Sequence, residues 1–238
     1  HWPEFAAAGK ATITLRQILN HTCGVIAIDR PLSLADVLAW EPVEAAIIAQ
    51  RPLWEPGSNQ GYHAVTWGML LRAIVPKMIG RSVGEALAEI ATPLGADAFV
   101  GLPKERLAQC APLVTLPKVR GVAGVVGAMM RNGIDGRFFR STLLRPSSPG
   151  ARAVANPKAL GALGFSNYDL PEVRFAELPW ANLHASARGL ARLYAPLAAD
   201  GAAFGVRTVS VEAAARPRAH QTWSDVDETL RKPLGFAQ

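Results

Sequence analysis

One tyrosine of this chain stands in a setting that could support proton transfer. Tyr62 follows a Pro-Gly turn at 56–57 and precedes a long apolar stretch at 63–79. A side chain between a tight turn and the start of a helix is held by a rigid scaffold and can point into a cleft. The pKa of a free phenol is about 10, and the positive end of a helix or a neighbouring cation lowers it. Tyr62 is therefore predicted to act as a general base or proton relay.

Two neighbours of Tyr62 are the other candidate site residues. Taken alone, a tyrosine at a helix start is more often a core residue, but the frame from Trp54 to Gly68 favours a role in chemistry. His63 could be a second acid/base group, although we favour a place in the cleft wall, where it would bind substrate. Trp54 is the tryptophan that we expect beside the substrate.

His21 and Cys23 are the remaining groups that could ligate a metal or attack a substrate. They lie two residues apart, but no companion pair with metal-ligand spacing occurs, so we predict no metal site. A cysteine nucleophile needs a base placed beside it, and the sequence supplies none. We expect no cofactor.

The elements that must position these residues are mainly helices. Two kinds of signal predict these helices. One is the capping box, which occurs at Thr14–Gln17 and in similar form from Ser33 and Ser82, and the other is the helical spacing of apolar residues. The predicted helices cover residues 14–24, 34–38, 44–50, 63–79 with a kink at Pro76, 83–91 and 184–199. Short strands are predicted at 98–101 and 208–210. The stretch 133–182 is rich in Gly, Pro, Ser and Asn and predicts no regular element.

Composition and charge narrow the function classes. The chain has 238 residues, of which 50% are hydrophobic and 18% charged, so it encodes a folded protein and not a disordered one. The net charge of +6 arises in residues 101–160, which hold 10 basic and 2 acidic residues. No nucleic-acid motif accompanies them, so no nucleic-acid partner is expected. A solvated surface is the simpler interpretation of this segment, and an anionic ligand or membrane surface is the alternative.

No apolar run approaches the roughly 18 residues that cross a membrane. The chain starts at His1 without a methionine, so we expect it to be part of a longer protein. The compartment stays open, with the cytoplasm favoured, and the sequence does not give the oligomeric state.

The run from Trp54 to Gly68 resembles the tyrosine motif of the serine hydrolases of the β-lactamase and penicillin-binding-protein superfamily. It is most similar to the class C β-lactamases and the esterases related to them. Residues 13–24 resemble the family's helix that ends in a His-Thr-Ser-Gly turn, with Cys23 in the place of the serine. Residues 93–95 and 182–194 are similar to two further segments of the family.

This resemblance implies an α+β fold of the β-lactamase/transpeptidase type, in which helices pack on an antiparallel sheet. The chain would supply mainly the helical region, with an incomplete sheet. We expect one partial hydrolase domain with a helical region and tyrosine motif at 1–110, a loop-rich insert at 111–182 and a helical segment at 183–238. An incomplete sheet leaves strand edges unpaired, so residues 1–238 alone are expected to be marginally stable.

The resemblance also implies a mechanism. In the family, the serine of a Ser-x-x-Lys motif forms an acyl-enzyme, and the lysine and the tyrosine manage its proton. A Lys-Thr-Gly or His-x-Gly motif lines the other side of the cleft. None of these three motifs occurs here, so we expect the nucleophile outside this chain and no activity from the chain alone. Tyr62 would carry the tyrosine role.

The departures from the family favour one substrate class. Class C enzymes have an asparagine two places after the tyrosine, and Ala64 stands there in this chain. The resemblance therefore implies a carboxylesterase that acts on a small ester or amide. A non-catalytic binding or scaffold protein of the same fold is the alternative, and a β-lactamase or D-Ala-D-Ala peptidase is a further one.

Overall fold

The structure is a computed structural model that describes residues 1–114, 118–130 and 134–237. Helices dominate its amino-terminal part. The helical elements there are η1 (Pro3–Gly9), α1 (Leu15–Leu19), α2 (Leu34–Ala39), α3 (Glu41–Ala49), α4 (Thr66–Ile79), α5 (Val83–Ala91) and η2 (Lys104–Gln109). The capping boxes predicted at Thr14, Ser33 and Ser82 are all formed, so the starts of α1, α2 and α5 are confirmed. Helix α4 begins three residues later than predicted and leaves Tyr62 in the preceding loop.

The segment 133–182, in which no regular element was predicted, contains several short helices, so that prediction was wrong. The helical elements from residue 118 onward are α6 (Lys118–Met130), α7 (Ile134–Leu144), α8 (Pro149–Ala155), η3 (Lys158–Leu160), η4 (Ala162–Asp169), α9 (Pro171–Phe175), α10 (Ala187–Ala198), α11 (Val211–Ala215) and η5 (Arg216–Arg218). Pro149 and Pro171 begin α8 and α9, and Ser148 caps α8. Because α8 and α9 span only 7 and 5 residues, they are too short to give a readable period.

Three small antiparallel pairs supply the strands. They are β1 (Ala98–Val100) with β2 (Leu183–Ala185), β3 (Ala202–Ala203) with β4 (Val206–Arg207), and β5 (His220–Ser224) with β6 (Leu234–Ala237). The strand predicted at 98–101 is confirmed. The strand predicted at 208–210 is wrong, because Ser210 instead caps α11 with its side chain. Neither β5 nor β6 was predicted.

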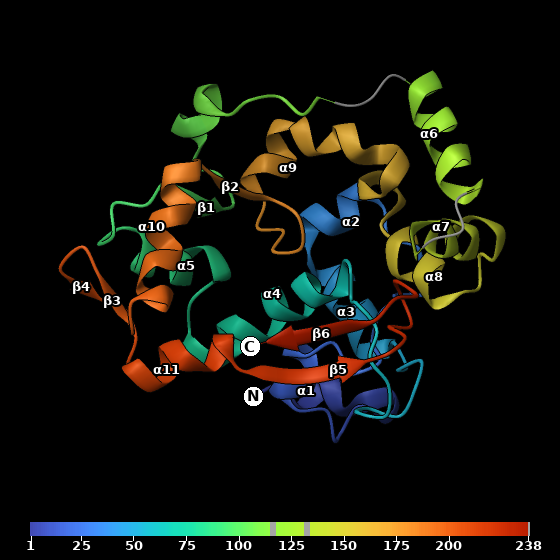
Figure 1. The fold of residues 1–238 in the computed structure, drawn as a ribbon, viewed down its shortest axis with the longest axis horizontal. Helices are drawn as coiled ribbons and strands as arrows, with labels where there is room; N and C mark the ends of the chain where they lie inside the picture. The colour runs from blue at the N-terminus through green and yellow to red at the C-terminus, as the bar shows by residue number, and fades with distance from the viewer. Residues whose placement is uncertain (115–117, 131–133, 238) are drawn as a thin grey trace.

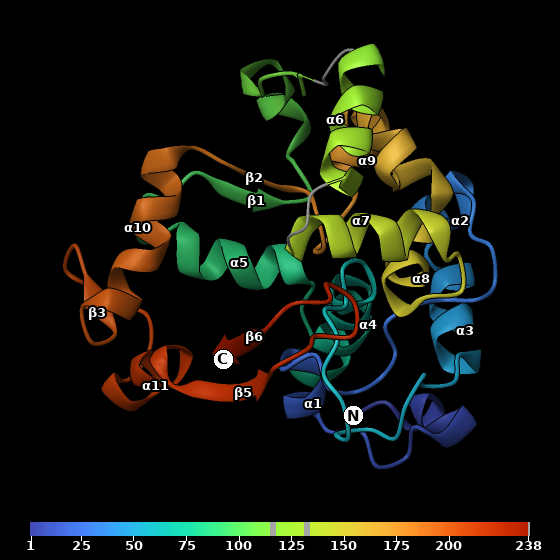
Figure 2. The same ribbon diagram turned by 45° about the vertical axis from the view of Figure 1, so that its right-hand side comes forward.

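The two ends of the molecule hold different elements. The β1–β2 pair, α5 and α10 lie at one end, and α6, α7 and α8 lie at the other (Figure 1). Strand β5 runs from α11 toward the end that holds α7 and α8, and β6 returns antiparallel to it. Figure 2 shows β1 and β2 alongside α5. The pair of carboxy-terminal strands therefore extends between the two ends of the molecule.

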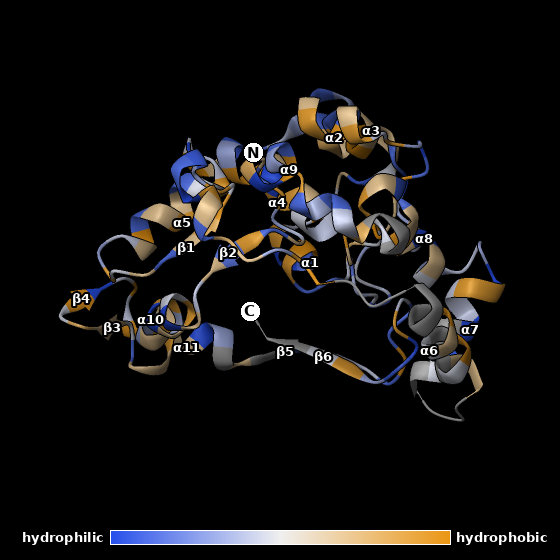
Figure 3. Cartoon of the chain, turned by 90° about the horizontal axis from the view of Figure 1, so that it is seen from above, coloured by the Kyte–Doolittle hydropathy of each residue, from blue (hydrophilic) through white to orange (hydrophobic). Residues whose placement is uncertain are grey.

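The main core lies between the amino-terminal helices and the segment around α9. Figure 3 shows hydrophobic residues along α2 and α3, which contribute fully buried side chains to this core. Its largest cluster of buried side chains includes Trp2, Phe5, Ile18, Val25, Val37, Val43, Ile47, Met69, Leu70, Val173 and Leu178. Helix α4 contributes to this core with Met69 and Leu70 and carries the tyrosine loop at its start.

A buried lysine joins the first residues to α3. Lys10 is 1% exposed, and its Nζ donates hydrogen bonds to the carbonyl oxygens of Ala7, Ile48 and Gln50 at 2.7, 2.7 and 2.6 Å. Burial lowers the pKa of Lys10 from its usual value. Three carbonyl acceptors satisfy all three donors of an ammonium group, which makes the burial of this charge possible.

Gly68, the last residue of the tyrosine motif, allows α4 to pass close to the backbone near Trp180. A Cβ atom at this position would lie 2.2 Å from Trp180 N and 2.7 Å from the carbonyl carbon of Pro179. Backbone atoms cannot move aside as a flexible side chain can. The glycine is therefore required by packing and not by its backbone conformation.

We expect Gly68→Ala to lower the free energy of unfolding by about 1–3 kcal/mol, the range for overpacking a core. Urea denaturation followed by circular dichroism measures the change. Gly127→Ala in α6 is the matched control, because a Cβ there meets no atom within 4 Å. The control should gain up to about 1 kcal/mol from helix propensity. Equal stabilities of the two variants would contradict the close approach.

Candidate active site

The tyrosine loop packs on the turn that ends α1. Gly57 N donates to Thr22 O at 2.9 Å, and Leu53 N donates to Gly24 O at 2.8 Å. Gly57 and Gly24 both have positive φ, at 92° and 80°, a region that glycine adopts without strain. The two segments that resemble family motifs, 13–24 and 54–68, therefore lie against each other.

Three consecutive backbone amides around Tyr62 are fixed by two distant segments. Gly61 N donates to His21 O at 3.1 Å, Tyr62 N to Asp227 Oδ1 at 3.2 Å, and His63 N to His21 Nδ1 at 3.0 Å. We call these three hydrogen bonds the amide clamp. It fixes the backbone on both sides of Tyr62.

Asp227 completes the amide clamp from a turn between β5 and β6. The residue is fully buried, and its Oδ1 also accepts hydrogen bonds from Thr229 N at 3.0 Å and Leu230 N at 2.8 Å. The same turn is held to the tyrosine loop by Gln60, whose carbonyl accepts from Glu228 N at 2.9 Å. One carboxylate oxygen thus joins three backbone amides from two parts of the chain.

The side chain of Tyr62 is partly accessible on this fixed backbone. It is 37% exposed, and its ring lies 5.2 Å from the ring of His21, centroid to centroid. A phenol with a fixed Cα and a partly exposed side chain can exchange a proton with a substrate or with a catalytic group that approaches it. Of the three predicted site residues, Tyr62 is the one whose placement fits chemistry on a substrate.

His63 lies inside the protein, which argues against the predicted substrate contact. It is 1% exposed, and its Nδ1 lies 2.6 Å from Gly61 O. Because a carbonyl oxygen can only accept, Nδ1 carries the proton and Nε2 is the acceptor. The Cys23 thiol lies 3.1 Å from Nε2 and donates to it.

The Cys23–His63 pair is neutral. Burial raises the pKa of Cys23 to about 12 and lowers the pKa of His63 to about 4. Burial, and then the proximity of His63, lowers the pKa of His21 to about 3. A thiol that keeps its proton at neutral pH is a poor nucleophile. The pair therefore packs behind the tyrosine loop as a structural group.

Trp54 packs against the tyrosine loop. Its Nε1 donates to Thr22 O at 3.2 Å, and its ring meets the ring of His63 edge-on at 6.4 Å. A Cβ at Gly61 would lie 2.6 Å from Cη2 of Trp54, so the indole fills the space under that glycine. Trp54 is half-buried, and its contacts favour a packing role over the predicted place beside the substrate.

The two buried histidines make stability depend on pH. In the unfolded chain both have a pKa of about 6.5, and in the folded protein the values are about 4 for His63 and about 3 for His21. Below pH 6.5 the unfolded chain therefore binds more protons than the folded chain. The free energy of unfolding should be unaffected by these groups above about pH 7 and should fall as the pH drops toward 4.

We expect the fall to reach about 1.4 kcal/mol per pH unit for each histidine. Urea denaturation between about pH 7.5 and about pH 5 measures it, a window above the titration of most carboxylates. His63→Gln removes one of these groups and should lower the slope by about 1.4 kcal/mol per pH unit, whatever its effect at neutral pH. An unchanged slope in this variant would contradict the neutral buried state of His63.

Two residues at the site have no clear signal in the sequence. His21 was considered only as a metal ligand together with Cys23, where no metal site was predicted, and no role was predicted for Asp227. The one local signal for Asp227 is the spacing Asp227-Glu228-Thr229, because an aspartate often accepts from the amide two residues later. Its contact with Tyr62 spans 165 positions and has no local signature.

Within the described residues, no group of three or more His, Cys, Asp or Glu side chains is placed to hold a metal ion. No helix in the same part of the chain combines the length and the apolar character needed to cross a bilayer.

Comparison with protein families gives a match over the whole chain. A family model described as Beta-lactamase covers residues 1–238. A curated protein of Mycobacterium tuberculosis (strain ATCC 25618 / H37Rv), described as esterase/beta-lactamase LipL, is 29% identical over 238 residues. The match covers 99% of this chain and 52% of that protein, so the chain spans about half the length of this curated relative.

Solved structures share the fold. EstA from Arthrobacter nitroguajacolicus Rue61a aligns with a TM-score of 0.76 and 25% identity, over 99% of this chain and 58% of that one. A family VIII carboxylesterase aligns with a TM-score of 0.78 and 26% identity, over 99% and 56%. A penicillin-binding protein homolog from Caulobacter crescentus aligns with a TM-score of 0.78 and 30% identity, over 99% and 56%. The predicted β-lactamase/transpeptidase-like fold, helical with small antiparallel sheets, is confirmed.

Proposed function

Because the chain belongs to the β-lactamase family, we propose that it is part of a serine hydrolase that cleaves small carboxylic esters. The observation that supports this most is the placement of Tyr62. Its backbone is fixed by the amide clamp, and its side chain is 37% exposed at the position that matches the family's tyrosine. The serine nucleophile would come from a Ser-x-x-Lys motif outside these residues.

The proposed reaction proceeds through an acyl-serine. Tyr62 accepts or relays the proton of the serine hydroxyl while the serine oxygen bonds to the ester carbonyl carbon. When the intermediate collapses, the bond to the alcohol oxygen breaks, and Tyr62 returns the proton to that leaving group. Water then attacks the carbonyl carbon of the acyl-serine, and Tyr62 accepts or relays its proton. The bond to the serine oxygen breaks, and the proton is returned to the serine. The products are a carboxylic acid and an alcohol.

An ester is favoured over a β-lactam by one residue of the tyrosine loop. Ala64 stands where class C β-lactamases carry an asparagine, so it offers no side-chain amide to a β-lactam substituent. Two relatives are described as an esterase/beta-lactamase and a family VIII carboxylesterase. The description of the first relative also names a beta-lactamase, and a third relative is a penicillin-binding protein homolog. Hydrolysis of a β-lactam is therefore the second candidate function.

The test uses the full-length protein that contains this chain. We expect turnover of 4-nitrophenyl butyrate and labelling of one serine by a fluorophosphonate, located by peptide mass spectrometry. A chromogenic cephalosporin should be hydrolysed slowly or not at all. Residues 1–238 expressed alone should give no turnover, because they contain no Ser-x-x-Lys. No turnover of either substrate and no labelling of the full-length protein would instead support a non-catalytic protein of this fold.

A further inference from the structure

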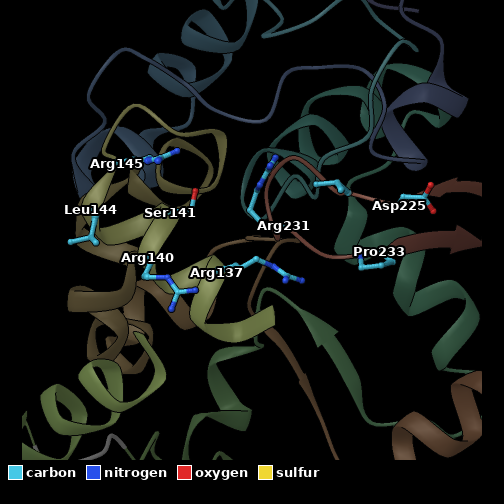
Figure 4. Close-up of a pocket in the computed structure, with 9 residues that line it drawn as sticks. Arg137, Arg140, Ser141, Leu144, Arg145, Asp225, Arg231 and Pro233 are labelled. Atoms are coloured by element: carbon cyan, nitrogen blue, oxygen red, sulfur yellow. The ribbon is translucent and has the colours of Figure 1, made fainter. Parts of the chain in front are cut away.

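A cavity of about 600 Å³ lies between α7 and the segment that connects β5 and β6 (Figure 4). Its lining includes four arginines, one serine and one carboxylate: Arg137, Arg140, Arg145, Arg231, Ser141 and Asp225. The volume falls in the range of small-molecule sites, about 300–1,000 Å³. The cavity is thus large enough for a small organic ligand.

The lining of this cavity carries a net positive charge. Arg231 is balanced by an ion pair with Glu228 at 2.8 Å, and Arg140 donates to Met129 O. Arg137 and Arg145 are exposed, and neither pairs with a carboxylate among the residues that the structure describes. The lining also includes the carboxylate of Asp225, so the arginines outnumber the acidic groups without excluding them. A concave surface with an excess of positive charge attracts an anion.

The cavity shows where three arginines of the basic segment 101–160 lie in the structure. Residues 101–160 carry 10 basic and 2 acidic residues, and their wide spacing suggested a solvated surface. Helix α7 and the residue that follows it instead bring Arg137, Arg140 and Arg145 to one cavity, and Arg231 joins them from the carboxy-terminal turn. The arrangement favours the alternative interpretation, an anionic ligand.

The same turn connects the cavity to the tyrosine. Arg231 lines the cavity, and its backbone N donates to Asp227 O at 2.8 Å. Asp227 in turn accepts from Tyr62 N as part of the amide clamp. A ligand bound by Arg231 would therefore contact the same turn that fixes the backbone of Tyr62.

From this geometry we propose that the cavity binds a carboxylate of the substrate, so that the enzyme prefers esters of dicarboxylic acids or other acidic esters. The proposal rests on the esterase function proposed above. A guanidinium matches a carboxylate with two parallel N–H···O bonds, and Arg137 and Arg145 have side chains available for this. Ser141 supplies a hydroxyl in the same lining.

The kinetic test compares 4-nitrophenyl hemisuccinate with 4-nitrophenyl acetate on the full-length protein. We expect the double variant Arg137→Gln/Arg145→Gln to lose about tenfold in kcat/KM for the hemisuccinate, mainly through KM, as charge-assisted hydrogen bonds are lost. Turnover of the acetate should change less than about twofold. Arg188→Gln is the matched control, because this exposed arginine of α10 lies at the other end of the molecule (Figure 1).

A binding measurement separates the two proposals. Calorimetry should detect succinate binding to the wild type and to Arg188→Gln, weakened about tenfold or more in the double variant. Succinate binding without hydrolysis of either ester would refute the esterase function and leave the carboxylate cavity supported. Absent succinate binding, or binding and ester preference that the double substitution does not change, would overturn the cavity proposal.

Discussion

Tyr62→Phe in the full-length protein is expected to lower kcat/KM for 4-nitrophenyl butyrate by about 10²–10⁴-fold, the contribution of a placed general base. The substitution removes only the phenolic O–H. The ring, with its centroid 5.2 Å from that of His21, keeps its packing, and the backbone amide still donates to Asp227. The loss should therefore lie in kcat, with an unchanged unfolding midpoint.

The matched control for this prediction is Tyr194→Phe. Tyr194 lies on α10 and is 63% exposed, so the same atom is removed from a surface far from the tyrosine loop in sequence. Its kcat/KM should stay within about twofold of the wild type, as for most surface substitutions. If Tyr62→Phe also kept full activity, the proton would be managed by another group and the proposed role of Tyr62 would be wrong.

Asp227→Ala is expected to lower the free energy of unfolding by about 3–6 kcal/mol, because it removes one acceptor from three backbone amides. Those amides belong to Tyr62, Thr229 and Leu230, at 3.2, 3.0 and 2.8 Å from Oδ1. A buried donor left without an acceptor costs about 1–3 kcal/mol. Urea denaturation of the purified protein gives the change in stability.

Asp227→Asn separates the role of the oxygen from that of the charge. An asparagine keeps an oxygen acceptor at the same position, so its loss of stability should be clearly smaller than that of the alanine variant. Ester turnover should follow the same order, since the amide clamp that fixes Tyr62 is retained in the asparagine variant. Equal stabilities of the wild type and Asp227→Ala would show that the three amides find other partners.

The local signals of the sequence were sufficient for the starts of three amino-terminal helices, although α1 ends at Leu19 and not at the predicted Gly24. Thr14, Ser33 and Ser82 each begin a helix where a capping box was predicted, because that signal depends on residues only three positions apart. The tyrosine motif likewise predicted a turn, a loop and a helix in the correct order. The fold class followed from the resemblance and is confirmed by structures with TM-scores of 0.76 to 0.78.

Features that depend on distant contacts could not be predicted. Strands β5 and β6 are short and carry no clear alternation, so their pairing is visible only in three dimensions. His63 and Trp54 were expected beside the substrate because they belong to the same sequence motif as Tyr62. Proximity along the chain does not fix the direction of a side chain, and the imidazole of His63 points to buried Cys23 instead.

Local sequence patterns also could not predict which charged side chains are buried or brought together. Lys10 reads as an ordinary surface lysine, yet its three carbonyl partners include Ile48 and Gln50, about 40 positions away. The arginines of the cavity were seen as singly spaced surface charges for the same reason. Which charges converge is decided by how α7 and the turn around Arg231 come together.

The amide clamp also has a consequence for the time at which the protein could become active during its synthesis. A ribosome adds roughly 5–20 residues per second, and Asp227 follows Tyr62 by 165 positions. His21 precedes the tyrosine, so its two hydrogen bonds can form on the growing chain, but the hydrogen bond to Asp227 must wait roughly ten to thirty seconds longer. The backbone geometry that the proposed proton transfer by Tyr62 requires is therefore complete only when the nascent chain has been extended past the turn that contains Asp227.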